Sequence, residues 1–200
     1  ELMRERAAEI ARVLTLEQGK PLSESKREVL LSADIVDFQA EEGKRLYGRT
    51  VPPRIDGMLS QTVSRRPIGP VAAFTPWNFP ANLPARKLGS ALAAGCSVVI
   101  KPAEETPGTC MLIVRCFLDA GVTPDALNMV CGDPAEVSST LIAHDAIRKA
   151  SLTGSVAVGK LLGRQCAKRV KRFTGELGGH APVIVCEDAD PARSEEHTSE

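Results

Sequence analysis

The chain has 200 residues, of which 43% are hydrophobic, which is enough apolar material for one large domain with appendages and excludes a disordered protein. Its 25 Lys and Arg residues balance its 25 Asp and Glu residues, so no basic excess indicates a nucleic-acid or anionic-membrane partner. No apolar stretch reaches the length that spans a bilayer. These features predict a soluble cytoplasmic protein that binds neither nucleic acid nor membranes.

Helical periodicity begins at the first residues. We predict one helix over residues 1–16 and a second over 23–42, with Ser23 as N-cap, because Gly19 and Pro21 supply a stop and a restart. Residue 1 lies inside the first pattern and is not Met, so we expect the native N-terminus further upstream. The periodic apolar residues of the first helix are Met3, Ala7, Ile10 and Leu14.

Between residues 47 and 66 the sequence pattern changes from helical spacing to the alternation typical of extended strands. A turn near Asp56 and Gly57, flanked by alternating residues, predicts a protruding hairpin. From residue 67 onward, short apolar runs alternate with helical segments, which predicts an α/β fold with a parallel, doubly wound sheet. The expected strands are 71–74, 97–100, 127–131 and 149–152, and the expected helices are 83–93, 107–120, 135–144 and 155–167.

A rigid segment follows the first of these strands. Pro76 and Pro80 fix their own φ angles and push the residues before them toward extended backbone, so Asn78 lies in a stiff, non-helical loop. Ligands of open α/β sheets bind at the carboxyl ends of the strands. The Asn78 amide can donate there to an oxyanion that develops in acyl chemistry. Alternatively, Asn78 bonds its own turn.

Two further strand ends carry candidate ligand-binding residues. The strand at 97–100 leads into Lys101, three residues before Glu104, and a carboxylate there accepts hydrogen bonds from a ribose but repels a 2′-phosphate. We therefore predict NAD in preference to NADP. At the strand-to-helix turn after residue 152, Gly154 permits close backbone approach and Ser155 can cap the helix. Alternatively, Lys101 and Glu104 form an ordinary exposed ion pair, and the turn at Gly154 and Ser155 is purely structural.

Six cysteines are scattered along the chain, without the close pairs typical of zinc sites or redox dithiols. Their apolar surroundings predict small buried side chains in a reducing compartment, where disulfides are rare, and no metal site. The cysteines are Cys96, Cys110, Cys116, Cys131, Cys166 and Cys186.

Five motifs together resemble the aldehyde dehydrogenase superfamily, in appearance closest to NAD-dependent succinate-semialdehyde dehydrogenase. The resemblance runs from about residue 1 to 191 and implies NAD(P)-dependent oxidation of aldehydes through a cysteine thiohemiacetal and thioester. The motifs are Glu17-Gln18-Gly19-Lys20-Pro21, Thr75-Pro76-Trp77-Asn78-Phe79-Pro80, Ala93-Ala94-Gly95-Cys96, Lys101-Pro102-Ala103-Glu104 and Glu176-Leu177-Gly178-Gly179.

The resemblance assigns roles to individual residues. It implies that Asn78 is the oxyanion-hole residue, that Glu176 is the general base that activates water, and that Arg86 lies where it can hold a substrate carboxylate. Without it, Glu176 would be an exposed residue before a turn, and Arg86 a surface residue of a helix. The residues implied for the cofactor are Thr75, Pro76, Trp77, Lys101, Glu104, Gly154, Ser155, Val158, Gly159 and Leu177.

The resemblance also divides the chain. We expect N-terminal helices over 1–46, an oligomerisation hairpin over 47–66 that implies a homodimer or homotetramer, an NAD-binding domain over 67–177, and the start of a mostly missing catalytic domain over 178–192. The nucleophilic cysteine of the family falls beyond this chain, so the chain alone should be inactive. Residues 193–200 break the pattern and read as a translated sequencing adapter, the alternative being a native polar tail.

Two other functions stay open. One is a nonenzymatic module that binds a dinucleotide or forms oligomers. The other is a different aldehyde dehydrogenase, either of other substrate specificity or a coenzyme-A-acylating relative. The presence of Glu176 favours water over a thiol as the acyl acceptor. We therefore predict NAD-dependent oxidation of succinate semialdehyde, or of a related carboxylated aldehyde, by the intact protein.

Overall fold

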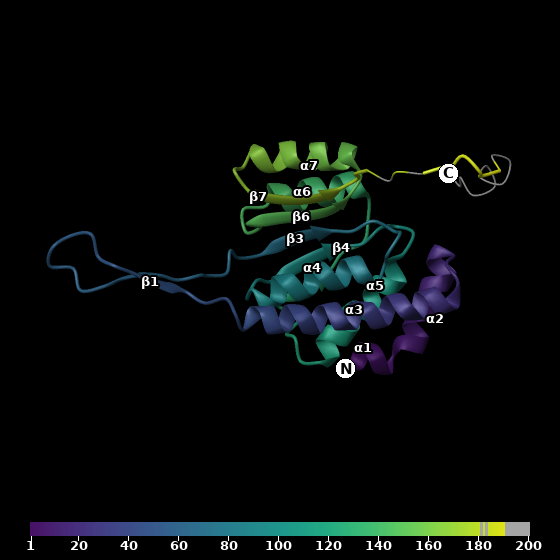
Figure 1. The fold of residues 1–200 in the computed structure, drawn as a ribbon, viewed down its shortest axis with the longest axis horizontal. Helices are drawn as coiled ribbons and strands as arrows, with labels where there is room; N and C mark the ends of the chain where they lie inside the picture. Colours follow the sequence, from purple (N-terminus) through teal and green to yellow (C-terminus); the bar gives the residue numbers. More distant parts are fainter. Residues whose placement is uncertain (181, 183, 191–200) are drawn as a thin grey trace.

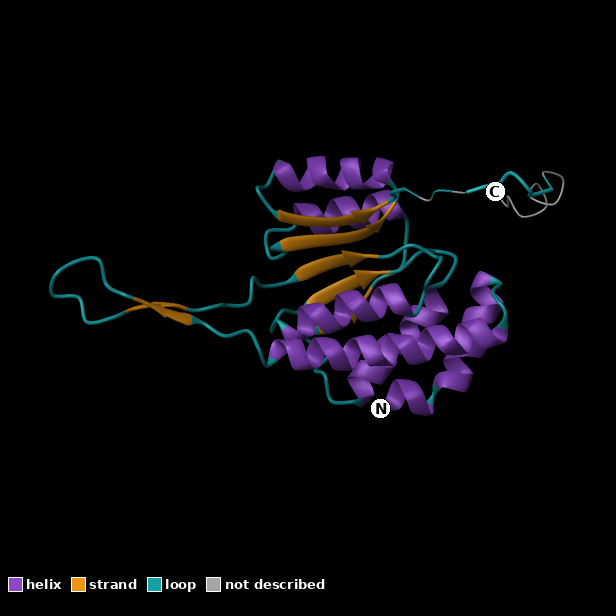
Figure 2. Cartoon of the chain, in the orientation of Figure 1, coloured by secondary structure: helices purple, strands orange, loops and turns teal. Residues whose placement is uncertain are grey.

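Helices cover both faces of a five-stranded parallel sheet in the computed structural model, which describes residues 1–180, 182 and 184–190 (Figures 1 and 2). The strand order is β5-β4-β3-β6-β7, so the predicted doubly wound α/β fold is confirmed. The strands are β3 (Val71–Phe74), β4 (Val98–Lys101), β5 (Leu127–Met129), β6 (Lys149–Gly154) and β7 (Arg172–Leu177). The helices are α1 (Leu2–Glu5), α2 (Ala7–Gln18), α3 (Leu22–Gly43), α4 (Asn82–Ala93), α5 (Pro107–Asp119), α6 (Pro134–Ala143) and α7 (Val156–Ala167).

The alternation of side chains along β3 explains why the sheet needs a helical layer on each side. Ala73 packs into the cluster formed with α1 to α5, whereas Ala72 and Phe74 pack into the cluster formed with α6 and α7. All four residues of β3 are buried, as a central parallel strand requires. The register aligns Val71 of β3 with Val98 of β4 and with Lys149 of β6.

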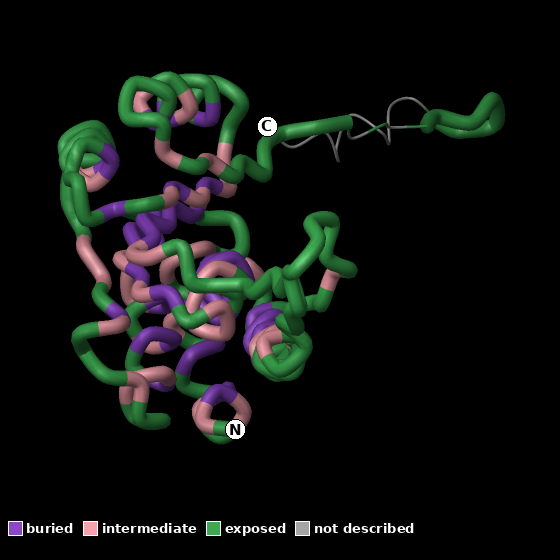
Figure 3. Tube along the Cα trace, turned by 90° about the vertical axis from the view of Figure 1, so that its left-hand side faces the viewer, coloured by how far each residue is buried: buried purple, intermediate pink, exposed green. Residues whose placement is uncertain are grey.

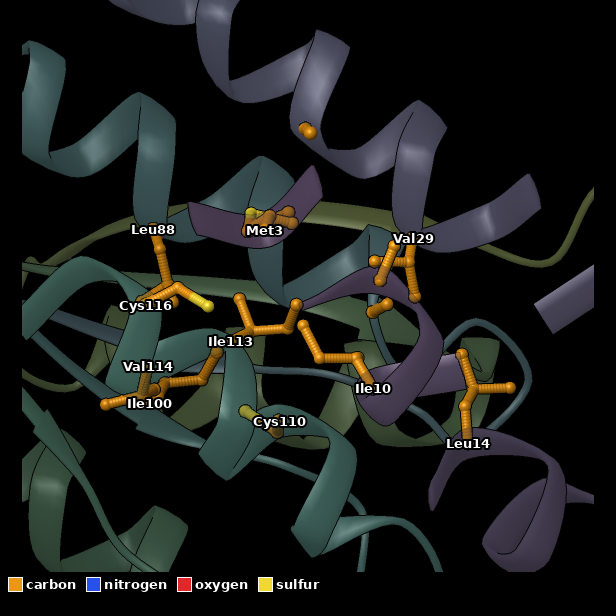
Figure 4. Packing of buried hydrophobic residues seen from close by; sticks show 14 of the residues in the cluster. Met3, Ile10, Leu14, Val29, Leu88, Ile100, Cys110, Ile113, Val114 and Cys116 are labelled. Carbon is orange, nitrogen blue, oxygen red and sulfur yellow. The ribbon is translucent and has the colours of Figure 1, made fainter. Parts of the chain in front are cut away.

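The larger core lies between the N-terminal helices and the sheet (Figure 4). Ile10 and Leu14 of α2, Leu88 of α4, Ile100 of β4 and Ile113 of α5 are all fully buried there. The helical spacing of Ile10 and Leu14 produces this inward face, because residues four apart lie on the same side of a helix. The tube coloured by burial shows the buried positions inside the body of the molecule, with exposed segments around them (Figure 3).

The N-terminal helices differ from the prediction in two respects. The first is interrupted at Arg6, where the backbone leaves helical geometry, so α1 and α2 are separate helices. Ser23 is not an N-cap: α3 begins one residue earlier, at Leu22, with Pro21 in the capping position and no side-chain cap. The predicted stop is confirmed, since Gly19 ends α2 in left-handed backbone with φ 89°.

The predicted hairpin is present and extends away from the body of the molecule (Figure 1). Its strands β1 (Arg49–Val51) and β2 (Gln61–Val63) pair antiparallel, with Arg49 opposite Val63. The turn lies at Asp56 and Gly57, and Gly57 has a φ of 86°, which favours glycine. Apolar side chains near the tip stay exposed, among them Ile55 and Leu59.

Four of the six cysteines are small buried side chains, as predicted: Cys96, Cys110, Cys116 and Cys166. Burial raises the pKa of the Cys110, Cys116 and Cys166 thiols, which keeps them protonated. The described residues contain no cluster of His, Cys, Asp and Glu that could hold a metal ion. None of the helices in the described ranges is long and apolar enough to cross a membrane. The adapter prediction for 193–200 lies outside the described residues.

Close packing of α7 on β7 depends on Gly159. A Cβ atom there would lie 2.5 Å from Cδ2 of Leu177. We expect Gly159→Ala to lose most of the roughly 1 kcal/mol that alanine gains over glycine inside a helix, because the end of the Leu177 side chain has to shift. Gly163 of the same helix is the matched control, since its nearest neighbour would be 3.8 Å away in Phe173.

At that position, we expect Gly163→Ala to stabilise the fold by up to about 1 kcal/mol through helix propensity. Urea unfolding of both variants measures the difference. Equal effects of the two substitutions would contradict the packing argument.

Candidate functional site

The site lies where the direction of the chain across the sheet reverses. The chain runs from β3 outward to β4 and β5, and then returns to β6 on the other side of β3. The loops after β3 and β6 therefore diverge, which opens a crevice at their carboxyl ends. Thr75 follows β3 and Ser155 follows β6, so the two loops singled out in the sequence lie on neighbouring strands.

A cavity of about 370 Å³ opens at this edge, and we call it the Glu104 cavity. Eight of the ten residues predicted to hold a cofactor line it. They are Thr75, Pro76, Trp77, Lys101, Glu104, Gly154, Ser155 and Val158. Residues from 75 to 158 in the sequence thus share one concave surface, which fits a single extended ligand better than several separate turns.

One end of the Glu104 cavity is acidic. Lys101 is 6% exposed, pairs with the carboxylate of Glu104, and donates to the carbonyl of Pro102 at 3.0 Å. Glu104 is 48% exposed in its side chain, so its carboxylate still faces the cavity. Glu105 lines the same cavity. Sequence reasoning missed Glu105, although its position next to Glu104 was a signal.

The N-terminus of α7 lies at the other wall. The Ser155 hydroxyl accepts a hydrogen bond from the Val158 amide at 3.3 Å, so the predicted cap is confirmed. The positive end of this helix dipole favours an anionic ligand group. Gly159 and Leu177 do not line the cavity and instead contact each other between α7 and β7.

A second cavity, of about 630 Å³, lies beside α3 and α4, and we call it the Arg86 cavity. Arg86 and Glu176 both line it, as does Phe79 from the rigid loop. The Arg86 Nε donates to Oδ1 of Asn82 at 2.8 Å, which anchors one edge of the guanidinium. Thr153 Oγ1 donates to Glu176 Oε2 at 3.4 Å from the paired position on β6.

Asn78 lies along the chain between Trp77, which lines the Glu104 cavity, and Phe79, which lines the Arg86 cavity. Asn78 is exposed, and among the described residues its side-chain amide has no hydrogen-bond partner. The bond to its own turn, which was the alternative, is therefore absent from this part of the structure. Asn78 itself lines neither cavity, although its chain neighbours Trp77 and Phe79 line one each.

Lys87 is a titratable residue that the sequence reasoning missed. Its Nζ donates to the Ser151 hydroxyl at 3.1 Å, and it lines a cavity of about 360 Å³ that also includes Glu176 and Lys149. Burial lowers the pKa of Lys87 from 10.5 to about 8, Glu176 raises it, and Lys149 lowers it. Its place in α4, one residue after Arg86, gave no signal in the sequence.

Fold and cavities together define an α/β protein with a ligand crevice at the switch point of a Rossmann-like sheet. A model of the aldehyde dehydrogenase family matches residues 1–198, and the chain belongs to that family. Its relatives include 4-(hydroxymethyl)benzenesulfonate dehydrogenase TsaD1 of Comamonas testosteroni, 52% identical over 96% of this chain and 40% of the relative. The NADP(+) succinate-semialdehyde dehydrogenase GabD of Escherichia coli (strain K12) is 47% identical over 94% and 39%.

Solved structures agree with this assignment. The crystal structure of succinate-semialdehyde dehydrogenase from Burkholderia pseudomallei superposes with a TM-score of 0.89 at 46% identity, and the match covers 98% of this chain and 40% of that chain. The chain therefore spans about 40% of the length of the relatives it matches. The sequence resemblance to aldehyde dehydrogenases is confirmed.

The lowered pKa of Lys87 predicts a pH dependence of stability. Between pH 8 and 10.5 the unfolded chain binds more protons at this residue than the folded chain does, so the free energy of unfolding rises with pH in that window. We expect the stability of wild type relative to Lys87→Gln to increase by about 1–2 kcal/mol from pH 8 to 10.5, since partial exposure reduces the full effect.

Chemical denaturation at several pH values measures this difference. Lys160→Gln, at an exposed position of α7, is the control. The same pH-dependent difference in both variants would contradict the burial argument.

Proposed function

We propose that the protein containing this chain oxidises an aldehyde to a carboxylic acid with NAD. The observation that carries the proposal is the grouping of eight residues expected to hold a dinucleotide in one cavity, while a second cavity contains Arg86 and Glu176. Membership of the aldehyde dehydrogenase family supports the reaction class. The resemblance implies a nucleophilic cysteine beyond residue 200, and we propose that the chain without it is inactive.

The residues of the Glu104 cavity fit a dinucleotide. Glu104 can accept hydrogen bonds from ribose hydroxyls, the N-terminus of α7 at Ser155 suits a phosphate, and the exposed face of Trp77 offers an apolar wall. NAD, when bound, takes up the two electrons and the hydrogen that leave the aldehyde carbon. The carboxylates of Glu104 and Glu105 favour NAD over NADP, even though the relative GabD carries NADP(+) in its name.

Asn78 and Glu176 are proposed to act in two further steps, attack on the aldehyde carbonyl and release of the acid product. The unpartnered Asn78 amide donates to the oxyanion that forms when the aldehyde carbonyl is attacked. Glu176, held by Thr153 on the neighbouring strand, serves as general base for the water that releases the acid product. Water as acceptor distinguishes this reaction from transfer of the acyl group to a thiol.

The substrate is proposed to carry an anionic group away from its aldehyde, as succinate semialdehyde does. The Arg86 guanidinium lines the cavity with one edge bound to Asn82, which leaves its terminal nitrogens for a carboxylate. The names of two relatives support an anion at this end, one with a carboxylate and one with a sulfonate. Both groups are planar or tetrahedral arrays of acceptor oxygens that an arginine can bind.

Assembly and location are proposals as well. The exposed hairpin at 47–66, with Ile55 and Leu59 uncovered, supports a homodimer or homotetramer. Six unpaired cysteines in the described residues support a reducing compartment such as the cytoplasm.

Replacing Arg86 tests the proposed function. In the longer protein, we expect Arg86→Ala to lower kcat/KM for succinate semialdehyde roughly 10- to 100-fold, because a charged hydrogen bond to the substrate is lost. The value for acetaldehyde, which has no carboxylate, should change less than about twofold. Absorbance of the reduced cofactor measures both rates.

Arg115→Ala, on the exposed surface of α5, is the control. Equal losses on the two aldehydes would contradict the carboxylate assignment, and binding of NAD without turnover of any aldehyde would contradict the enzyme assignment.

Replacing Glu104 tests the cofactor preference. We expect Glu104→Ser to lower the ratio of kcat/KM for NAD to that for NADP on the order of tenfold, because the repulsion of a 2′-phosphate and the bonds to the ribose are both lost. Glu136→Ser in α6 is the control, because Glu136 lies outside the Glu104 cavity. An unchanged ratio in Glu104→Ser would reject its proposed contact with the ribose.

A further inference from the structure

Lys20 and Glu28 form a buried ion pair beside the rigid loop that carries Asn78. Lys20 Nζ lies 2.6 Å from Oε2 of Glu28, and the two side chains are only 12% and 4% exposed. Removing two charges from water is costly, and the cost is offset only where further hydrogen bonds satisfy both groups. Among the described residues, the other hydrogen bonds of these two side chains and the ring contact of Lys20 all involve residues 78–82.

Glu28 holds the end of this segment. Its Oε1 accepts hydrogen bonds from the backbone amides of Ala81 at 2.9 Å and Asn82 at 3.1 Å. These amides belong to the first turn of α4, where backbone donors have no partner within the helix. Ala81 in the capping position has no side-chain acceptor of its own, so a carboxylate from α3 supplies the cap.

Lys20 holds the beginning of the segment. Its ammonium donates to the carbonyl oxygen of Asn78 at 3.1 Å and lies 4.3 Å from the centre of the Phe79 ring. The pair thus fixes the peptide that follows Asn78, the next side chain and the start of α4. The contacts are separated by more than fifty residues in the sequence.

We propose that Lys20 and Glu28 are positioning residues that orient the Asn78 amide toward the oxyanion, an inference that rests on the proposed function of Asn78. The side-chain amide has no hydrogen-bond partner among the described residues, so the backbone of the loop sets its starting point by fixing the direction of the Cα–Cβ bond. Pro76 and Pro80 restrict the φ and ψ angles of the loop, whereas Lys20 orients the peptide group between them.

Glu17 provides an internal comparison. Its carboxylate accepts from the amides of Gly108 at 2.6 Å and Thr109 at 2.8 Å, and so caps α5 in the same way as Glu28 caps α4. It does not contact the Asn78 loop. Loss of the Glu17 cap should therefore reduce stability without changing the direction of the Asn78 amide.

A double-mutant cycle in the longer protein tests the proposal. We expect Asn78→Ala to lower kcat on the order of 10²- to 10³-fold, as loss of an oxyanion donor does. Lys20→Met alone should lower kcat roughly tenfold through misplacement of that donor, with less than about a twofold change in KM for NAD. In the Asn78→Ala background, Lys20→Met should have no further effect on kcat, because the group it orients is gone.

Two controls and one substitute variant separate positioning from folding. Glu17→Gln should lower the melting temperature while kcat stays within about twofold. Lys20→Arg retains the cation and should restore most of the kcat lost in Lys20→Met. Where Lys20→Met does not fold, Glu28→Gln takes its place in the cycle, since it keeps an acceptor for Ala81 and Asn82 but loses the charge that holds Lys20.

The outcomes are distinguishable. An unchanged kcat in Asn78→Ala would overturn the proposed function of Asn78 itself. If Asn78→Ala lowers kcat strongly but Lys20→Met leaves it unchanged, the positioning role is overturned. It is also overturned if Lys20→Met lowers kcat by the same factor in the Asn78→Ala background as in wild type. In either case the ion pair has only a structural role.

Discussion

The parallel arrangement of the five strands is the constraint on which the rest of this structure depends. Parallel strands all end at the same edge of the sheet, and the order β5-β4-β3-β6-β7 makes the chain reverse its direction at β3. The loops after β3, β4 and β6 are thereby brought to one crevice. Trp77, Glu104 and Ser155 lie on those three loops and share a single cavity.

Charged side chains of the N-terminal helices bind backbone amides near this edge of the sheet. Glu17 and Glu28 lie on consecutive helices, and each caps a helix of the sheet layer, at Gly108 and at Ala81 respectively. Backbone amides at a helix start need acceptors, and carboxylates meet that need more strongly than neutral groups do. The helical layer thus stabilises the sheet and also orders the loops from which the cavities are built.

The two cavities have different electrostatic character, which fits them to different ligands. The Glu104 cavity combines carboxylates at one wall with a helix N-terminus at the other, a pattern suited to a molecule with hydroxyl groups and phosphates. The Arg86 cavity mixes cations and carboxylates, namely Lys20, Arg27 and Arg86 with Glu24, Glu28 and Glu176. Asn78 lies along the chain between Trp77 of the first cavity and Phe79 of the second.

Local sequence determined the elements that depend on near neighbours: the buried run of β3, the stop at Gly19, the turn at Gly57 and the cap at Ser155 all follow from short-range backbone and side-chain preferences. The resemblance of the motifs to a known family further predicted the family and most of the residues that line the Glu104 cavity. Only the tertiary structure decided the contacts of Lys20, Glu28, Lys87 and Glu105. Such contacts join segments far apart in the chain, and no local pattern specifies which buried charge finds which partner.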